Sequence, residues 1–496
     1  MKIRIATTVL GMTLCMVQSH AQNINGTQSR NSFEKFRQEL RDDFDDFRQQ
    51  CMSDFVAFMR NPWKEFEETA PIPLPKEEVV PPVVMPKEDR KKPIDDKPVV
   101  IHKVIPPTPV IPQPQPVVPI QEVPVVKEHH AEFSFFGTSA KVRYVPEAKL
   151  TLHGINENHV ADAFGQLAKG GQYDNMLLDC LALRKNLQLS DWAYLQMLKA
   201  LSEKLQGRDS NEAVILMAYL FMQSGYQMRM ASNANKLYML FATKHILFDY
   251  PSYTIDGSSY YSTEELPAKL SICQVAFPKE KMLSLQITTH QQLTVALSTK
   301  REITSLSYPT FKASIAVNKN VVSFYETYPT SMIGADFMSR WALYANTPMD
   351  SIASAQLYPA LRQQLKGLSQ IDAANRLLNW VQTGFKYEYD DKVWGHDRAF
   401  FAEESLYYPY CDCEDRCIML SRLVRDLLGL KVILVYYPGH LAMAVGFNED
   451  VNGDYITLNG QRFLICDPTY INAPVGRTMP KMDNEKATVI LLDNVQ

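Results

Sequence analysis

Apolar residues between positions 31 and 66 recur at steps of three or four, with charged residues between them. They are Phe33, Phe36, Leu40, Phe44, Phe47, Cys51, Phe55 and Phe58. This spacing predicts an amphipathic helix, capped by Asn31 and Glu34 and ended near Pro62. One helix cannot bury these side chains by itself, so we expect the helical segment 31–66 to self-associate or to dock on a partner protein. The alternative is that it folds back onto this chain's own domains.

The chain after residue 129 shows first helical and then strand-like patterns. Helical periodicity marks residues 159–170, 175–187, 191–205 and 211–228. β-branched and aromatic residues predict strands within residues 236–250, 284–289, 292–298, 313–318 and 321–328. We therefore expect a helix-rich domain over residues 129–250 and a β-rich domain over residues 251–330.

Prolines concentrate between the amphipathic segment and these domains. Residues 71–128 hold 16 of the 30 prolines, with Lys and Glu clusters between them. Such a sequence favours extended polyproline II, which at about 3.1 Å per residue could span roughly 170 Å. The stretch is predicted to be a linker, and both a spacer across an envelope compartment and a plain tether remain open.

The first 21 residues have the pattern of a secretory signal peptide. Lys2 and Arg4 precede an apolar run from about Ile5 to Val17, and Ser19 to Ala21 fit a small-x-small cleavage site. The run is shorter than the roughly 20 residues that a spanning helix needs. We expect an exported protein, in a periplasm, cell envelope or extracellular space, with no transmembrane span after signal cleavage.

Composition narrows the class of partner. A formal charge of -4 over 496 residues gives no general reason to expect nucleic acid as a partner.

Seven cysteines remain after the signal, too few for a disulfide framework in a chain of this length. Four of them, Cys411, Cys413, Cys417 and Cys466, fall in the last 90 residues. An odd number of cysteines in an exported protein indicates a free thiol.

The stretch that begins CDCEDRC at Cys411 continues with helical spacing up to Gly429. With Asp412 as N-cap, Cys413 stands at the first helical position, where unpaired backbone N–H groups and the helix dipole stabilise a thiolate. His440 opens the strand-like segment HLAMAVGF, and Asp467 ends FLIC. A nucleophilic thiol needs a base and a group that orients the base, so these three residues are candidates for a Cys-His-Asp triad.

In these three segments, DCEDRCIMLSRLVRDLLGL, GHLAMAVGF and FLICDPTY, the chain resembles the transglutaminase-like superfamily of papain-fold cysteine enzymes. The resemblance covers residues from about 375 to the C-terminus. It implies an α+β fold and acyl transfer through a thioester, with Cys413 as nucleophile, His440 as general base and then acid, and Asp467 as the orienting acid. The chain departs from the family pattern in two ways: Cys411 replaces a glycine, and Ala442 and Met443 stand where an aromatic residue is usual.

Residues around the triad suggest an oxyanion donor and bear on metal binding and disulfide formation. Trp394, or else His396, is a candidate side-chain donor to the oxyanion, beside the backbone N–H of Cys413. The first-turn acids Glu414 and Asp415 are expected to be solvent-exposed partners of the helix dipole. A zinc site is disfavoured, because C-x-C-x(3)-C at a helix start is not the usual ligand spacing. A regulatory disulfide between Cys413 and Cys411 or Cys417 remains open.

The sequence thus predicts a multidomain α+β protein whose C-terminal domain is transglutaminase-like. Its expected parts are a signal peptide (1–21), an amphipathic helical segment (22–70), a linker (71–128), the helix-rich and β-rich domains (129–250 and 251–330) and a catalytic domain (331–496). The expected function is that of a cysteine peptidase or amidase acting on protein or peptide substrates, with no metal and no organic cofactor. The alternatives are a cross-linking transglutaminase and a catalytically inactive envelope scaffold.

Overall fold

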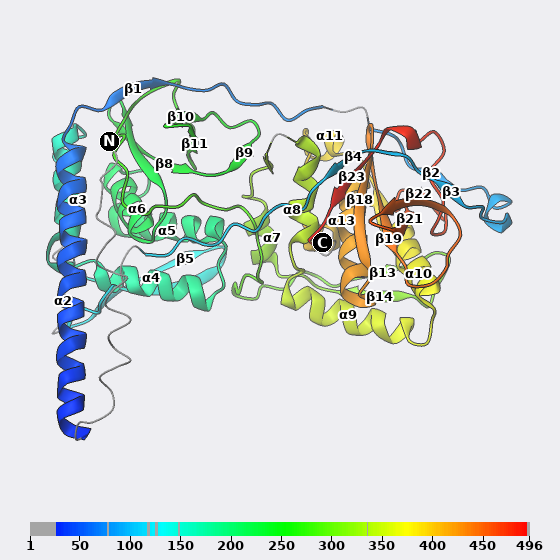
Figure 1. Ribbon diagram of the computed structural model, residues 1–496, viewed down its shortest axis with the longest axis horizontal. Coiled ribbons are helices and arrows are strands. Elements are labelled where there is room, and N and C mark those ends of the chain that lie inside the picture. The colour runs from blue at the N-terminus through cyan, green and yellow to red at the C-terminus, as the bar shows by residue number, and fades with distance from the viewer. Residues whose placement is uncertain are drawn as a thin grey trace.

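The computed structural model describes residues 26–493 except 77–78, 117–119, 125–126, 147–148 and 335. The expected signal peptide lies outside these residues, as do the side chains of Phe33, Leu40 and Phe44. The fold is mixed α+β and consists of two lobes side by side, with the long helix α2 at one end (Figure 1). No helix within the described residues is long and apolar enough to cross a membrane.

Helix α2 (Gly26–Met59) ends three residues before Pro62, close to the predicted end, and β1 (Lys64–Glu67) follows. It begins five residues before Asn31, so the expected cap at Asn31 is wrong. Its last turns bury Cys51, Phe55 and Met59. Phe55 contacts the ring of Phe164 on α3 (Glu157–Ala168), with ring centroids 5.9 Å apart. This end of the helix therefore folds back onto its own chain.

The N-terminal lobe contains the four helices that the periodicity predicted. They are α3, α4 (Asp174–Asn186), α5 (Asp191–Gln206) and α6 (Asn211–Gln223). The side chains of Asn156, Ser190 and Ser210 cap α3, α5 and α6 by accepting hydrogen bonds from backbone N–H groups. The hairpin of β5 (His129–Phe135) and β6 (Thr138–Tyr144) packs on α4 and α5.

A six-stranded antiparallel sheet packs against α6 in the same lobe. Its order is β1, β12 (Lys269–Ile272), β7 (Met228–Asn233), β8 (Lys236–Ala242), β11 (Ser258–Tyr261) and β10 (Tyr253–Ile255). Strands β7 and β8 lie inside residues 129–250, so helices and sheet share one core there. A smaller pair joins β9 (His245–Leu247) to β15 (Ser331–Ile333).

Three of the predicted strands take another form. Residues 321–328 begin inside helix α7 (Lys319–Tyr325), because the Asn318 side chain caps it. Residues 284–289 and 292–298 form no regular strand. Some of their backbone N–H groups donate to side chains instead, such as Ser284 to Asp191 and Ala296 to Asn318. The prediction for residues 313–318 is confirmed by β14 (Lys312–Ile315), which pairs with β13 (Arg301–Thr304).

The C-terminal lobe is built around a seven-stranded sheet. Its order is β3 (Lys97–Pro98), β20 (Asp454–Leu458), β21 (Gln461–Cys466), β19 (His440–Gly446), β18 (Lys431–Tyr437), β23 (Ala487–Leu491) and β4 (Ile101–Ile105). Alternate residues of β18 and β19, such as Leu434 and Met443, face the large core that includes α13 (Cys413–Leu428), while Ile433 and Ala444 face a second apolar cluster. Further helices are α8 (Arg340–Asn346), α9 (Ser351–Leu365), α10 (Gln370–Gly384), α11 (Asp390–Val393) and α12 (Ala402–Tyr407).

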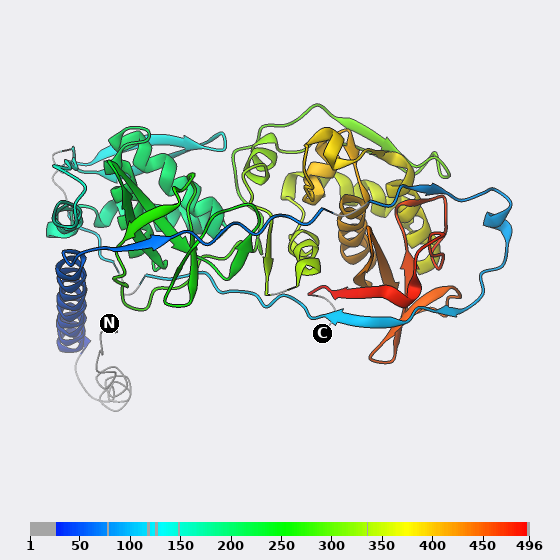
Figure 2. The same ribbon diagram turned by 90° about the horizontal axis from the view of Figure 1, so that it is seen from above.

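The proline-rich segment does not project from the molecule as a spacer. Figures 1 and 2 show it running from β1 along the C-terminal lobe, turning at the far end of that lobe and returning to the N-terminal lobe. On this path β2 (Val83–Val84) pairs with β22 (Tyr470–Ile471), β3 with β20, and β4 with β23. Proline lacks a backbone N–H, and these strands are correspondingly short or at the sheet edge.

Candidate active site

Strands β19 and β21 bring His440 and Asp467 together. His440 is the first residue of β19, directly after the Pro438–Gly439 turn, and Asp467 directly follows β21. The His440 Nε2 and Asp467 Oδ2 atoms are 2.9 Å apart, and each residue is only 2% exposed. The Asp467 Oδ1 atom accepts hydrogen bonds from the backbone N–H groups of Thr469 (2.8 Å) and Tyr470 (3.2 Å). The Asp467 carboxylate therefore orients the His440 imidazole, and backbone N–H groups of the loop after Asp467 orient the carboxylate.

The other ring nitrogen of His440 has no hydrogen-bond partner among the described residues. The Nδ1 atom is buried, whereas a buried polar atom normally has a partner. With Nε2 donating to Asp467, Nδ1 is the nitrogen with a free lone pair. Any proton that His440 accepts from a nucleophile would go to this atom.

Helix α13 begins at Cys413 and ends before Gly429, which adopts the left-handed conformation, as the sequence predicted. The Asp415 carboxylate accepts the backbone N–H of Asp412 (3.2 Å), which fixes the entry to the helix. Leu441, the residue after His440, joins this helix to β19. Its backbone N–H donates to the Cys413 sulfur, and its carbonyl accepts the Cys417 thiol at 3.1 Å. The start of the helix is thus tied to the strand that begins with His440.

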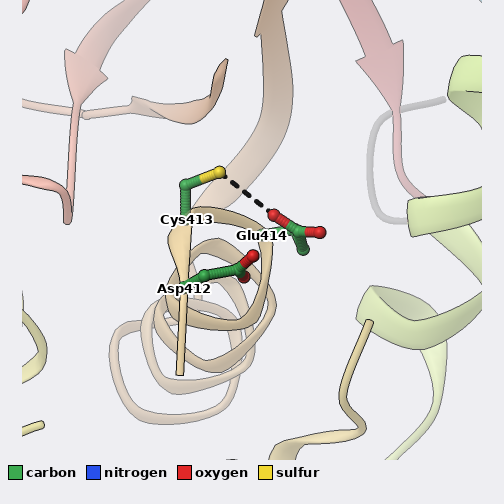
Figure 3. Close-up of side chains that lie close together, drawn as sticks. All are labelled: Asp412, Cys413 and Glu414. Atoms are coloured by element: carbon green, nitrogen blue, oxygen red, sulfur yellow. Dashed lines mark hydrogen bonds between the residues drawn. The ribbon is translucent and has the colours of Figure 1, made fainter. Parts of the chain in front are cut away.

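The Cys413 thiol does not bond to His440 in this arrangement; it donates to the Glu414 carboxylate, with Sγ to Oε2 at 3.0 Å (Figure 3). The thiol is 4% exposed. Burial, followed by the negative charges of Glu414 and Asp412, raises its pKa well above the usual value. The expectation of a thiolate stabilised by the helix N-terminus is therefore wrong for this arrangement, because burial and two neighbouring acids outweigh the helix dipole.

The sequence led us to expect that the first-turn acids are solvent-exposed, and this expectation is wrong. Glu414 is 6% exposed and Asp415 is fully buried. Asp415 lies inside because its carboxylate also accepts the backbone N–H of Phe400 at 2.7 Å, which joins the loop before α12 to the helix start. Both residues belong to the packing of the site.

Five carboxylates gather beside Cys413. Those of Asp390, Asp397, Asp412, Glu414 and Asp415 form overlapping groups whose potential ligand atoms lie within 4.8 Å of one another. Burial and the charge of Glu414 raise the pKa of Asp390 to about 8 and that of Asp397 to about 7. Carboxylate oxygens are the ligands that a hard divalent cation prefers, so a cation could balance the negative charge of this cluster. Protons shared between the carboxylates would balance the same charge without a cation.

The described cysteines are all free and buried. Among the described residues, Cys413 is the one cysteine in a cluster of potential metal ligands, and its neighbours there are carboxylates. Within the described ranges, no such cluster contains two cysteines. Burial raises the pKa of Cys411 to about 11, so this residue is also a protonated thiol near neutral pH.

Trp394, the candidate oxyanion donor, closes α11 and packs on Phe400 and Tyr408, with ring centroids 5.8 and 5.0 Å away. Its buried Nε1 atom has no partner within the described residues, so the donor is free. The alternative, His396, lies on the exposed surface with Nδ1 3.0 Å from the Trp394 carbonyl oxygen. The structure records no contact that joins either side chain to Cys413.

Tyr387 is a residue that the sequence did not indicate. Its hydroxyl is buried and unpartnered within the described part of the chain. Burial, then the negative charges of Cys413, Asp412 and Glu414, raise its pKa. A tyrosine that lies in the same negative field as the thiol is a neutral O–H donor at the site. Tyr387 stands in the upstream segment KYEYD without a motif around it, so no pattern marked it.

Comparisons with known proteins add no assignment. No family model matches the chain, and neither the curated proteins nor the solved structures contain a match.

Proposed function

We propose that the chain is an exported cysteine hydrolase of transglutaminase-like type that cleaves amide bonds of proteins or peptides. The observation that carries the proposal is the His440–Asp467 pair, joined at 2.9 Å, with His440 at the start of the strand to which the Cys413 helix is tied through Leu441. Both the order of the three residues and their positions on a helix start, a strand start and a strand end support it.

In the proposed reaction Cys413 is the nucleophile, His440 accepts and returns protons, and Asp467 orients and stabilises His440. His440 Nδ1 takes the Cys413 proton as the sulfur attacks the carbonyl carbon of the substrate, and Asp467 stabilises the imidazolium through Nε2. The C–N bond breaks as His440 protonates the leaving amine, which leaves a thioester on Cys413. His440 then takes a proton from water as the water oxygen attacks the thioester, and the acid product and free thiol form.

The thiol has to turn from Glu414 to His440 for this reaction. A rotation about the Cα–Cβ bond of Cys413 moves its sulfur without moving the helix. The arrangement with Cys413 on Glu414 is then a resting form, and the competent form has the sulfur beside the unpartnered Nδ1 of His440. Acyl transfer to an amine is the same chemistry with an amine in place of water.

The second candidate is a scaffold that binds partners without catalysis. The observation that favours it is the burial of Cys413 together with the acids that keep its thiol protonated. A scaffold would show no acyl-enzyme and no dependence of thiol chemistry on His440.

Acyl trapping tests the two functions. The mature protein is incubated with p-nitrophenyl acetate, and each cysteine-containing peptide is assayed for an acetyl thioester by mass spectrometry. We expect an adduct on Cys413 that hydroxylamine releases, and we expect loss of the adduct in Cys413→Ser and in His440→Ala. A trap with added alkyl amine separates hydrolysis from transfer by its product. An adduct that is absent, or that is equal in His440→Ala, would overturn the hydrolase proposal.

A further inference from the structure

A short part of the proline-rich segment bonds to the backbone close in sequence to both His440 and Asp467. The backbone N–H of Val80 donates to the carbonyl of Gly439 at 2.9 Å, directly before His440. Strand β2 (Val83–Val84) then runs parallel to β22 (Tyr470–Ile471), and the N–H of Met85 donates to the Ile471 carbonyl at 2.9 Å. Residues 79–85 therefore form an extended strap, held by main-chain hydrogen bonds.

The strand on which the strap lies is connected to the catalytic carboxylate. The backbone N–H of Tyr470, the first residue of β22, donates to Asp467 Oδ1 at 3.2 Å. The Gln382 side chain bonds the carbonyls of both Asp467 and Tyr470. Whatever pairs with β22 is thus placed at a fixed position relative to Asp467 and His440.

Met85 is the buried side chain of the strap, and the partly buried Val80 and Val83 pack against the same apolar cluster. Met85 is 2% exposed and lies in an apolar pocket with Tyr470, Ala473 and Met479. By contrast, Val84 is 62% exposed. A flexible, unbranched side chain suits such a pocket, and main-chain pairing requires no particular sequence.

The strap has fewer strand pairs than β4, a later part of the same segment. Strand β4 pairs with β23 through four residue pairs, whereas β2 pairs with β22 through two. Pro81 and Pro82 bring no N–H groups to the strap. A segment with few backbone hydrogen bonds and one buried side chain opens locally at a small free-energy cost.

From these contacts we propose that the strap occupies the track on which a polypeptide substrate binds: the edge of β22, the Gly439 carbonyl and the Met85 pocket. This inference rests on the proposed function and names its substrate as an extended polypeptide with a Met-like apolar side chain. Pairing with β22 holds the scissile amide in a fixed position relative to the His440–Asp467 pair. In the resting chain the strap occupies this track itself, and the substrate enters when the strap leaves.

The test uses the full mature chain with Met85→Glu, which places a charge in the apolar pocket, and a matched control, Val110→Glu, at a valine that is 59% exposed. A fluorescent peptide with the sequence of residues 79–85, VVPPVVM, is titrated against each protein and followed by anisotropy. We expect binding to Met85→Glu at least about tenfold tighter than to the wild type and to Val110→Glu, because the competing segment has been released. Iodoacetamide should also label Cys413 faster in Met85→Glu.

Equal peptide binding by the variant, the control and the wild type would overturn the proposal, provided that thermal unfolding shows a folded variant. If Met85→Glu does not fold, Met85→Ala replaces it, with the same two outcomes. Peptide binding needs no thiol, so it is repeated in Cys413→Ser. Binding that persists while His440→Ala leaves Cys413 chemistry unchanged would support the peptide track and reject the hydrolase. An acyl-enzyme on Cys413 without peptide binding would support the hydrolase and reject the peptide track.

Discussion

The Cys413 thiol is hydrogen-bonded to the carboxylate of its own neighbour, Glu414, at 3.0 Å, and not to the imidazole of His440. One acid therefore competes with the base for the nucleophile. The competition makes Glu414 a residue whose removal should activate the thiol.

Glu414→Gln should raise the reactivity of Cys413. Gln can still accept the thiol hydrogen, but it carries no negative charge, so the pKa of Cys413 should fall. A fall of one pKa unit means an about tenfold faster alkylation with iodoacetamide near neutral pH. The matched control is Glu403→Gln on α12, a buried glutamate that accepts the backbone N–H of Asp350. Unchanged labelling of Cys413 in Glu414→Gln would mean that Glu414 does not hold the thiol.

Two substitutions at Asp467 separate charge from structure. In Asp467→Asn, one oxygen can still accept the N–H groups of Thr469 and Tyr470, but the amide then faces His440 Nε2 with hydrogens. This favours the tautomer with a proton on Nδ1, which cannot act as a base. Acylation of Cys413 should fall about 10²-fold or more with little loss of stability.

Asp467→Ala should lose both the rate and the stability. It leaves the loop N–H groups without their acceptor at a cost of about 1–3 kcal/mol. The two variants are compared by acyl-trapping rate and by thermal unfolding. Asn and Ala variants with equal rates close to that of the wild type would show that the His440–Asp467 bond has no part in the chemistry.

The carboxylate cluster should make the folded protein less stable as the pH rises. Asp390 and Asp397 have pKa values of about 8 and 7 in the folded state, above the usual 3.8. Between about pH 4 and pH 8 the folded state therefore binds more protons than the unfolded state, so the free energy of unfolding decreases with rising pH and levels off above this window.

Removing one of these carboxylates should make the stability of the protein depend less on pH. In Asp397→Asn we expect the midpoint of thermal unfolding to fall less between pH 5 and pH 8, with a change of about 2–4 °C for each kcal/mol. Asp209→Asn, in an exposed loop of the N-terminal lobe, is the control and should follow the wild type. A variant profile parallel to that of the wild type would contradict the raised pKa of Asp397.

Gln382 should support the site through the loop that carries Asp467. Its Nε2 atom lies 3.0, 2.7 and 3.0 Å from the carbonyl oxygens of Asp467, Tyr470 and Ala473. Gln382→Leu leaves these buried groups without a donor, at a cost of about 1–3 kcal/mol, measured by denaturant unfolding.

The control for Gln382 is Gln356→Leu on α9, which breaks similar bonds to the carbonyls of Ala316 and Ile352 away from the site. Both variants should lose stability, and only Gln382→Leu should also slow the acylation of Cys413. Equal acylation in the two variants would limit Gln382 to a structural part.

The local elements of the site were predictable because their signals lie close together in the sequence. Helical spacing after Cys413, the αL glycine at Gly429 and the alternating strand after the Pro438–Gly439 turn each specify one element. Short turns join β18 to β19 and β20 to β21. The pairing of β19 with β21, which brings His440 to Asp467, passes over β20 in the sequence.

The surroundings of the thiol were not predictable, since they depend on contacts between distant segments. The dipole rule treats Glu414 and Asp415 as surface residues, but both are buried, and the loop carrying Phe400 bonds to Asp415. Proline content indicated a linker and could not show that its residues 83–84 pair with β22. Likewise, the β-branched run at residues 321–328 favours a strand, whereas the cap at Asn318 begins a helix there.

The proposed triad is tested most directly by iodoacetamide labelling of the folded protein across pH, read for each cysteine by mass spectrometry, in the wild type and in His440→Ala. If His440 activates Cys413, labelling of Cys413 near pH 7 should fall at least about tenfold in the variant, while labelling of the buried Cys411 and Cys417 stays the same. Equal pH profiles for Cys413 in the two proteins would contradict the triad.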